Sequence, residues 1–188
     1  MITKIAGRFL VLVGAAVILG AFVLIIVMPQ LDWGAIAKPP MLEKRLAGIV
    51  LRRWVRRDAP PVHNPLVATA DNLKTARREF QEHCAICHGA DGSAHNLLGA
   101  DFYPPIARLE RGAPGWSDGE LYFIIANGIR YTGMPGFGAN HGPDDIWRAI
   151  LWIRHLPHLT EAERAELRQS RPGLMEHNEH DQGPGNDD

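Results

Sequence analysis

The stretch that decides the fold is Cys84-Ala85-Ile86-Cys87-His88. Its two cysteines are the only ones in the chain, and their spacing suits a disulfide, half of a metal site, a thiol redox pair or a haem attachment site. A zinc site needs two more ligands at a paired spacing, and the other histidines are scattered singly. A thioredoxin-like redox pair needs strands alternating with helices, which we do not find in the surrounding sequence. The histidine that directly follows the second cysteine favours covalent haem attachment.

Charge is distributed unevenly along the 188 residues, although the formal net charge is only −1. Residues 38–57 hold 7 of the 20 basic residues, whereas residues 58–188 hold 11 basic and 19 acidic residues, a net charge of about −8. The small net charge therefore results from a basic segment and an acidic segment, whose surfaces suit different partners. The acidic excess over most of the chain makes nucleic acid a poor candidate partner.

The N-terminal segment is apolar enough to span a membrane. Residues 9–28 contain no charged or strongly polar side chain, and 20 helical residues extend about 30 Å, the thickness of a hydrocarbon core. We predict a signal-anchor or transmembrane helix within residues 1–30, because the apolar part of a cleaved signal peptide is usually about 7–15 residues long. Cleavage is the alternative, since Ala35-Ile36-Ala37 resembles a cleavage site. Basic residues on both sides leave the orientation open.

Residues 31–65 are expected to form a basic amphipathic helix and a proline-rich linker. Apolar side chains recur every three to four positions in residues 41–57, with basic side chains beside them. Such a helix suits an anionic membrane surface, and packing on the folded domain or on a partner subunit is the alternative. Residues 58–71 contain three prolines near their start, which end a helix, and the segment would make a tether of at most about 43 Å. The apolar positions are Leu42, Leu46, Ile49, Val50 and Trp54, and the basic ones are Lys44, Arg45, Arg52, Arg53, Arg56 and Arg57.

Helical signals surround the attachment stretch. A first helix is expected over residues 71–84, capped by Asp71 or Asn72. Ser117 and Glu120 form a capping box that opens a second helix, which closes at Gly128. A last core helix begins near Pro143 and its two following acids. Residues 160–188 are expected to form a short charged helix over residues 161–169 and a disordered polar tail.

The sequence resembles the class I cytochromes c, and among them the membrane-anchored monohaem c-type cytochromes of bacterial respiratory chains. The resemblance covers residues 66–159 and rests on residues 80–89, 128–135 and 146–154. It implies an all-α, cytochrome c-like helical domain around one covalently attached haem c, preceded by a single N-terminal transmembrane helix. One departure is Ala76, where many relatives have glycine at the crossing of the first and last helices.

The residue on the sixth iron position separates an electron carrier from an enzyme or a sensor, because an occupied position leaves no open site for a substrate. We predict that His88 and Met134 are the two axial metal ligands. Met134 lies 46 residues after His88, in a glycine-rich loop that can cover a flat porphyrin face. His95 and His141 are the alternative ligands.

Further residues are expected to bind or support the haem. The resemblance implies that a proline carbonyl accepts the second hydrogen bond of His88, and we expect Pro104, with Pro105 as the alternative. Three side chains are candidates to bind the haem propionates, with the arginine favoured by its charge: Trp116, Arg130 and Tyr131.

These features predict one-electron transfer, as a shuttle or as a subunit of a respiratory complex, and no catalytic residues. The alternative is a haem peroxidase-type enzyme or a gas sensor with an open or labile sixth position. Because proteins of this resemblance acquire haem outside the cytoplasm, we expect the bacterial inner membrane, with the haem domain on the periplasmic side. The expected partners are the membrane, through the N-terminal helix, and redox proteins such as a quinol-oxidising complex, a dehydrogenase or a terminal oxidase.

Overall fold

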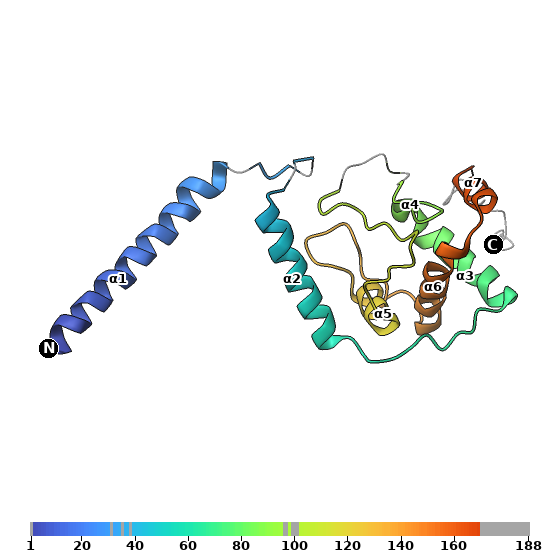
Figure 1. Cartoon of the computed structure of the whole chain (residues 1–188), viewed down its shortest axis with the longest axis horizontal. Coiled ribbons are helices and arrows are strands. Elements are labelled where there is room, and N and C mark those ends of the chain that lie inside the picture. Colours follow the sequence, from blue (N-terminus) through green and yellow to red (C-terminus); the bar gives the residue numbers. More distant parts are fainter. Residues whose placement is uncertain are drawn as a thin grey trace, which may run out of the picture. The chain divides into compact units, whose positions relative to one another are not determined.

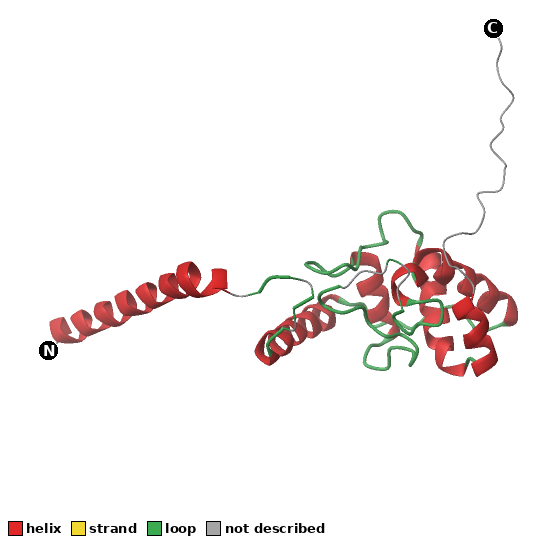
Figure 2. Ribbon diagram, turned by 90° about the horizontal axis from the view of Figure 1, so that it is seen from above, coloured by secondary structure: helices red, strands yellow, loops and turns green. Residues whose placement is uncertain are grey.

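The computed structural model describes residues 2–30, 32–34, 36–37, 39–95, 98 and 102–169. The chain divides into two compact units, Met1–Lys38 and Pro39–Asp188. The fold is all-α: every regular element in the described residues is a helix (Figure 2). The polar tail expected after residue 169 lies outside the described residues.

The first unit is a continuous apolar helical rod. It consists of α1 (Ile2–Phe22), the π-helical turn η1 (Val23–Val27) and the 3-10 turn η2 (Met28–Gln30) (Figure 1). The most apolar 18 residues within the span 6–30 have a mean hydropathy of 3.2, and none of these 18 residues is buried. Twenty-five helical residues extend about 37 Å, so one helix of this chain is long and apolar enough to cross a membrane. A signal sequence near the N-terminus would have the same properties.

The second unit contains the remaining helices. They are α2 (Met41–Asp58), α3 (Ala70–His83), α4 (Ala85–His88), α5 (Asp118–Asn127), α6 (Pro143–His155), η3 (Leu156–His158) and α7 (Glu161–Gln169). Helices α3 and α6 lie against each other (Figure 1). Ala76 and Phe80 of α3 and Ile150 of α6 are fully buried between them. Alanine at position 76 is thus small enough for this crossing, where the resemblance suggested glycine.

Of the two side-chain caps predicted from the sequence, the one at Ser117 is confirmed and the one at Asp71 or Asn72 is wrong. The Ser117 hydroxyl accepts a hydrogen bond from Glu120 N at 3.2 Å, and the Glu120 carboxylate accepts one from Ser117 N at 2.7 Å. Helix α3, however, is capped by the hydroxyl of Thr69, which accepts from Asn72 N, and Asp71 lies inside the first turn. Thr69 is in the extended conformation that an N-cap requires, whereas Asp71 is already helical.

Helix α2 packs on α5 with its C-terminal half. Val55 is fully buried, and the ring of Trp54 lies 4.9 Å from that of Phe123 in α5. Arg56 pairs with Glu120 at 3.6 Å. The apolar side chains of the N-terminal half remain exposed, so only part of the amphipathic face is covered by the domain. They are Met41, Leu42, Leu46, Ile49 and Val50.

The proline-rich segment after α2 is fixed to the domain, and the expectation of a free tether over residues 58–71 is wrong. Asn64 N donates to the Asp118 carboxylate at 3.1 Å, and the Asn64 amide donates to Trp147 O at 2.8 Å. A Cβ at Gly119 would collide with Pro60 O, so glycine permits the close approach of the two backbones. These contacts join residues 60–64 to the starts of α5 and α6.

Candidate functional site

The haem attachment stretch forms a tight turn at the end of α3. Cys84 lies between α3 and α4, and His88 N donates to Cys84 O at 2.9 Å, so both thiols and the imidazole occupy little more than one helical turn. Burial, with smaller contributions from Glu79 and Cys87, raises the pKa of Cys84 to about 12. Reactive dithiols have lowered pKa values, so the direction of this shift is opposite to that of a redox pair.

His88 is held in one orientation by a main-chain carbonyl. Its Nδ1–H donates to Ala107 O at 2.9 Å, which leaves the lone pair on Nε2 available for a metal. Burial lowers the pKa of His88, and the bond to Ala107 opposes this only in part, so the ring remains neutral, as a ligand must. The prediction that Pro104 or Pro105 supplies this carbonyl is wrong.

The main chain explains why the acceptor is residue 107. Gly92 O, in the turn after His88, accepts hydrogen bonds from Leu109 N at 2.7 Å and Glu110 N at 3.0 Å. A Cβ at Gly92, whose φ is +76°, would lie 2.7 Å from Leu156 and 2.9 Å from Glu110 N. The close packing fixes residues 109–110 beside the turn, which places Ala107 next to the imidazole.

Helix α7 supports the same turn through a buried carboxylate. Arg168 Nε donates to Asp91 Oδ2 at 2.6 Å, and Asp91 is 1% exposed. Burial alone would raise the pKa of Asp91, but hydrogen bonds from Ser93 and Arg168 outweigh it and hold the pKa below its usual value. The turn after the attachment stretch is thereby joined to the C-terminal helix.

The loop that carries Met134 is folded back on the end of α5. Ile129 N donates to Met134 O at 3.1 Å, and Phe137 N donates to Ile125 O at 3.0 Å. Gly128 makes the fold possible, because its φ is +67° and a Cβ there would lie 2.5 Å from Gly136 N. The side chain of Met134 is partly buried against the hydrophobic core.

The two alternative axial histidines each face a polar side chain. The Nδ1 atom of His95 is 2.7 Å from the Ser93 hydroxyl. The Nε2 atom of His141 is 3.9 Å from the Glu79 carboxylate.

The three candidate propionate ligands have different surroundings. Arg130 and Tyr131 are exposed and have no hydrogen bond or ion pair within the described residues, and Tyr131 is 91% exposed. Trp116 is half-buried, with the guanidinium of Arg52 stacked 5.0 Å from its ring centre. Helix α2 therefore covers one face of Trp116.

Arg154 organises the segment before α5, a role that the sequence analysis did not assign. Its guanidinium donates to Asp118 Oδ1 at 2.9 Å and to Trp116 O at 2.7 Å, and also to Gly112 O and Ala113 O. The i to i+36 separation of the charge pair leaves no local sequence pattern by which it could be found.

The donor set fits a haem c group. Two unpaired thiols lie within one turn, and the adjacent imidazole presents a free Nε2 because Nδ1 is donated to Ala107. No other cysteine is present, so the chain can form thioether bonds to one haem at this motif.

Comparison with known proteins agrees with this geometry. Residues 71–153 match the family model described as cytochrome c oxidase, cbb3-type, subunit III. No curated protein matches the sequence.

The solved structures that are similar to the chain include the following two. A reducing HAO-like protein complex of Kuenenia stuttgartiensis is 22% identical with a TM-score of 0.43 over 52% of this chain, which spans 50% of that protein's length. Cytochrome CL from Methylophaga aminisulfidivorans is 18% identical with a TM-score of 0.37, over 78% of this chain and 91% of that one. Both TM-scores are low, so the assignment rests on the family model and on the attachment turn, which identify residues 71–153 as a cytochrome c domain.

Proposed function

We propose that this chain is a membrane-anchored, monohaem one-electron carrier, as a shuttle or as a subunit of a respiratory complex. The observation that carries the proposal is the hydrogen bond from His88 Nδ1–H to Ala107 O, which leaves the lone pair of Nε2 free for a metal. Cys84 and Cys87 would hold the haem covalently, and His88 and Met134 would be its axial ligands. The bound haem supplies a one-electron iron couple, and an occupied sixth position keeps substrates from the metal.

Each protein group has a separate task in this proposal. The loop of residues 129–138 holds Met134 against the core through main-chain hydrogen bonds, so the thioether stays in place when the iron changes charge. Arg130 would pair with a haem propionate, since no acid of the described residues neutralises it. Tyr131 and Trp116 would bind the same edge, and Pro104 lies in the segment that leads to Ala107.

Absorption spectra of Met134→Ala test the ligation. We expect the oxidised wild-type protein to show the weak far-red band of methionine bound to iron(III), and the variant to lose it. Met41→Ala is the matched control, because Met41 is 65% exposed at the start of α2 and lies outside the loop. A wild-type protein without the band, in a high-spin state, would overturn the carrier and favour a peroxidase-type enzyme or a gas sensor.

We also propose that α1, η1 and η2 anchor the chain in the bacterial inner membrane, with the haem domain in the periplasm. The uncharged segment and its hydropathy support the anchor. Reporter fusions after residue 38 test the orientation: an alkaline phosphatase fusion should be active and a cytoplasmic reporter inactive. The reverse pattern would contradict it.

The exposed part of α2 is proposed to contact the lipid surface. Leu42 and Leu46 are 67% and 53% exposed, and basic side chains flank them, which suits an anionic interface. A fluorophore on Leu46→Cys should shift to the blue in vesicles with anionic lipid, and one on exposed Asp71→Cys should not. Equal spectra at the two positions would contradict lipid contact.

The redox partners are proposed from the class of protein. The family model is that of a terminal oxidase subunit, which supports a terminal oxidase as electron acceptor, and a quinol-oxidising complex or a dehydrogenase would be the donor. The acidic surface of residues 58–188 suits basic docking surfaces on such proteins. Nucleic acid is not a partner in this proposal.

A further inference from the structure

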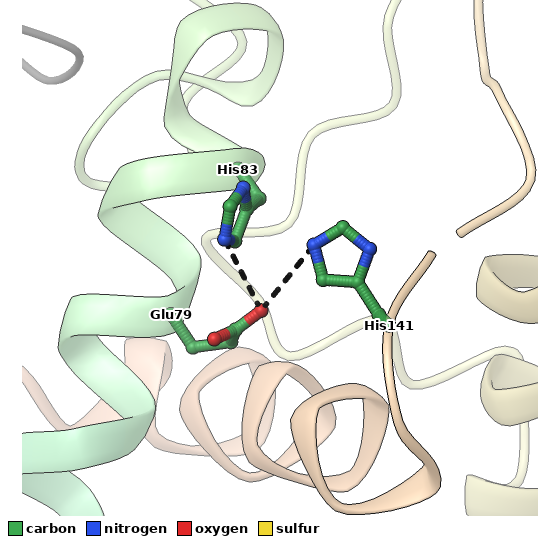
Figure 3. A group of neighbouring side chains, drawn as sticks. All are labelled: Glu79, His83 and His141. Carbon is green, nitrogen blue, oxygen red and sulfur yellow. Dashed lines mark ion pairs between the residues drawn. The ribbon is translucent and has the colours of Figure 1, made fainter. Parts of the chain in front are cut away.

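Two histidines and a glutamate converge at the C-terminal end of α3 (Figure 3). Glu79 and His83 are one helical turn apart on α3, and His141 comes from the segment just before α6. The Glu79 Oε1 atom is 3.6 Å from His83 Nε2 and 3.9 Å from His141 Nε2. Figure 3 shows both rings directed toward the same carboxylate oxygen.

The distances are close to those of a metal site. One ligand atom from each residue lies within 4.8 Å of the other two. With zinc bonds of about 2.0–2.2 Å, two ligand atoms of a tetrahedral site lie about 3.3–3.5 Å apart. Small rotations of these side chains would therefore bring the three atoms into one coordination sphere.

The charges around Glu79 leave its carboxylate available for a cation. Among the described residues Glu79 has no lysine or arginine partner, whereas its acidic neighbours Asp145 and Glu82 pair with Arg148 and Arg78. Burial raises the pKa of Glu79, and Asp145 and Glu82 raise it further against the opposing effect of the two histidines. A bound cation would relieve this repulsion.

We propose that Glu79, His83 and His141 bind one divalent transition-metal ion of the zinc type, at a site separate from the haem attachment stretch. Imidazole and carboxylate are ligands that Zn²⁺ prefers. The side chains of Glu79, His83 and His141 are 16%, 37% and 20% exposed, so solvent can reach the site and complete the coordination. The ion would join α3 to the segment that precedes α6.

The surroundings of His141 set the expected strength of binding. Its Nδ1 atom is buried and has no hydrogen-bond partner within the described residues. A ligand histidine usually donates that N–H to an oxygen, and loss of such a bond typically weakens metal binding by about 10–100-fold. The site is therefore a weaker one than a fully supported zinc centre.

Calorimetric titration of the haem-containing full chain with Zn²⁺ tests the proposal. His177 and His180, which could bind zinc by themselves, are first replaced by alanine. We expect one Zn²⁺ per chain, at least tenfold weaker binding in His141→Ala and in Glu79→Gln, and a rise in the thermal unfolding temperature of the parent protein with Zn²⁺. His158→Ala is the control, because this exposed histidine is remote from Glu79 in sequence and has no contact with it.

The location of the ion is checked in the His177→Ala, His180→Ala parent protein, with the three proposed ligands unchanged. Anomalous scattering at the zinc edge in crystals of the parent protein should give a peak between Glu79, His83 and His141, distinct from the iron signal. Absence of zinc binding by the parent protein, equal affinity in His141→Ala, or a zinc peak elsewhere would overturn the proposal. Haem absorption and far-ultraviolet circular dichroism establish that each variant is folded.

Discussion

Arg154 of α6 and Asp118 at the start of α5 form a two-point ion pair: the Nε and Nη2 atoms of the guanidinium lie 2.9 and 2.8 Å from the same carboxylate oxygen. The remaining donors bind main-chain carbonyls of residues 112–116. Asp118 also accepts the main-chain hydrogen bond from Asn64. The pair thus connects α5, α6 and the segment after α2.

We expect Arg154→Met to lower the free energy of unfolding by about 2–3 kcal/mol, because it removes a half-buried charged donor and leaves several acceptors unpaired. Arg154→Lys should recover only part of the loss, since an ammonium cannot reproduce the planar set of donors. Arg108→Met is the control, with an expected change below about 0.5 kcal/mol, because the ion pair with Glu110 is at the surface. Urea unfolding of the haem-containing protein measures all three, and equal losses for Met and Lys would contradict the multidentate role.

The Asp118 carboxylate makes the free energy of unfolding depend on pH. Burial would raise the pKa of Asp118, but hydrogen bonds from Asn64 and Arg154 outweigh it, so the pKa is lower in the folded protein than in the unfolded chain. Its contribution to stability is complete above the unfolded pKa of about 4 and disappears as the pH falls through the folded pKa. The free energy of unfolding of Asp118→Asn should therefore fall less than that of the wild type between pH 5 and 3. The difference should correspond to the titration of about one group. If the unfolding free energies of the two proteins changed in parallel with pH, the ion pair would not favour the ionised form of Asp118.

Gly128 tests whether the loop of residues 129–138 positions Met134, the proposed sixth ligand. Gly128→Ala adds a Cβ that would lie 2.5 Å from Gly136 N at a φ of +67°, so we expect the loop to shift, the far-red band to weaken and the midpoint potential to fall. Gly115→Ala is the matched control, since its Cβ would meet only the end of Arg52 at 3.8 Å. Spectra and potentials unchanged in Gly128→Ala would mean that the loop does not position the ligand.

Two valines of α2 test whether this helix belongs to the domain. Val55 is fully buried against the domain and Val50 is 67% exposed. Val55→Ala should cost about 1–2.5 kcal/mol of unfolding free energy, and Val50→Ala less than about 0.5 kcal/mol. Thermal unfolding in detergent compares the two variants, and equal effects would contradict the packing of α2 on α5.

Features that depend on a few neighbouring residues could be predicted from the sequence. The capping box at Ser117 and the helix stop at Gly128 are local, and the structure confirms them. The stretch from Cys84 to His88 strongly favours covalent haem attachment over the alternatives, and this prediction agrees with the family model.

Features that depend on distant backbone contacts could not be predicted. The partner of His88 is Ala107 because Gly92 O accepts hydrogen bonds from residues 109 and 110. Every residue has a main-chain carbonyl, so no side-chain pattern in the sequence indicates which one is the acceptor. The proline-rich segment was predicted to be a free tether because the hydrogen-bond partners of Asn64, Asp118 and Trp147, are 54 and 83 residues away in the sequence. The Glu79 and His83 pair is visible at i and i+4, but His141 joins them only through the packing of α6 on α3.

The main-chain acceptor of His88 has an evolutionary consequence. Because the oxygen at position 107 belongs to the peptide backbone, exchanging the Ala107 side chain leaves the imidazole's hydrogen bond in place. Substitutions of this exposed alanine are therefore expected to change the surface while they leave in place the bond that would set the basicity of His88 in the proposed haem site. In the proposed haem site, substitutions that tune the reduction potential would then be expected at Met134 and in its loop.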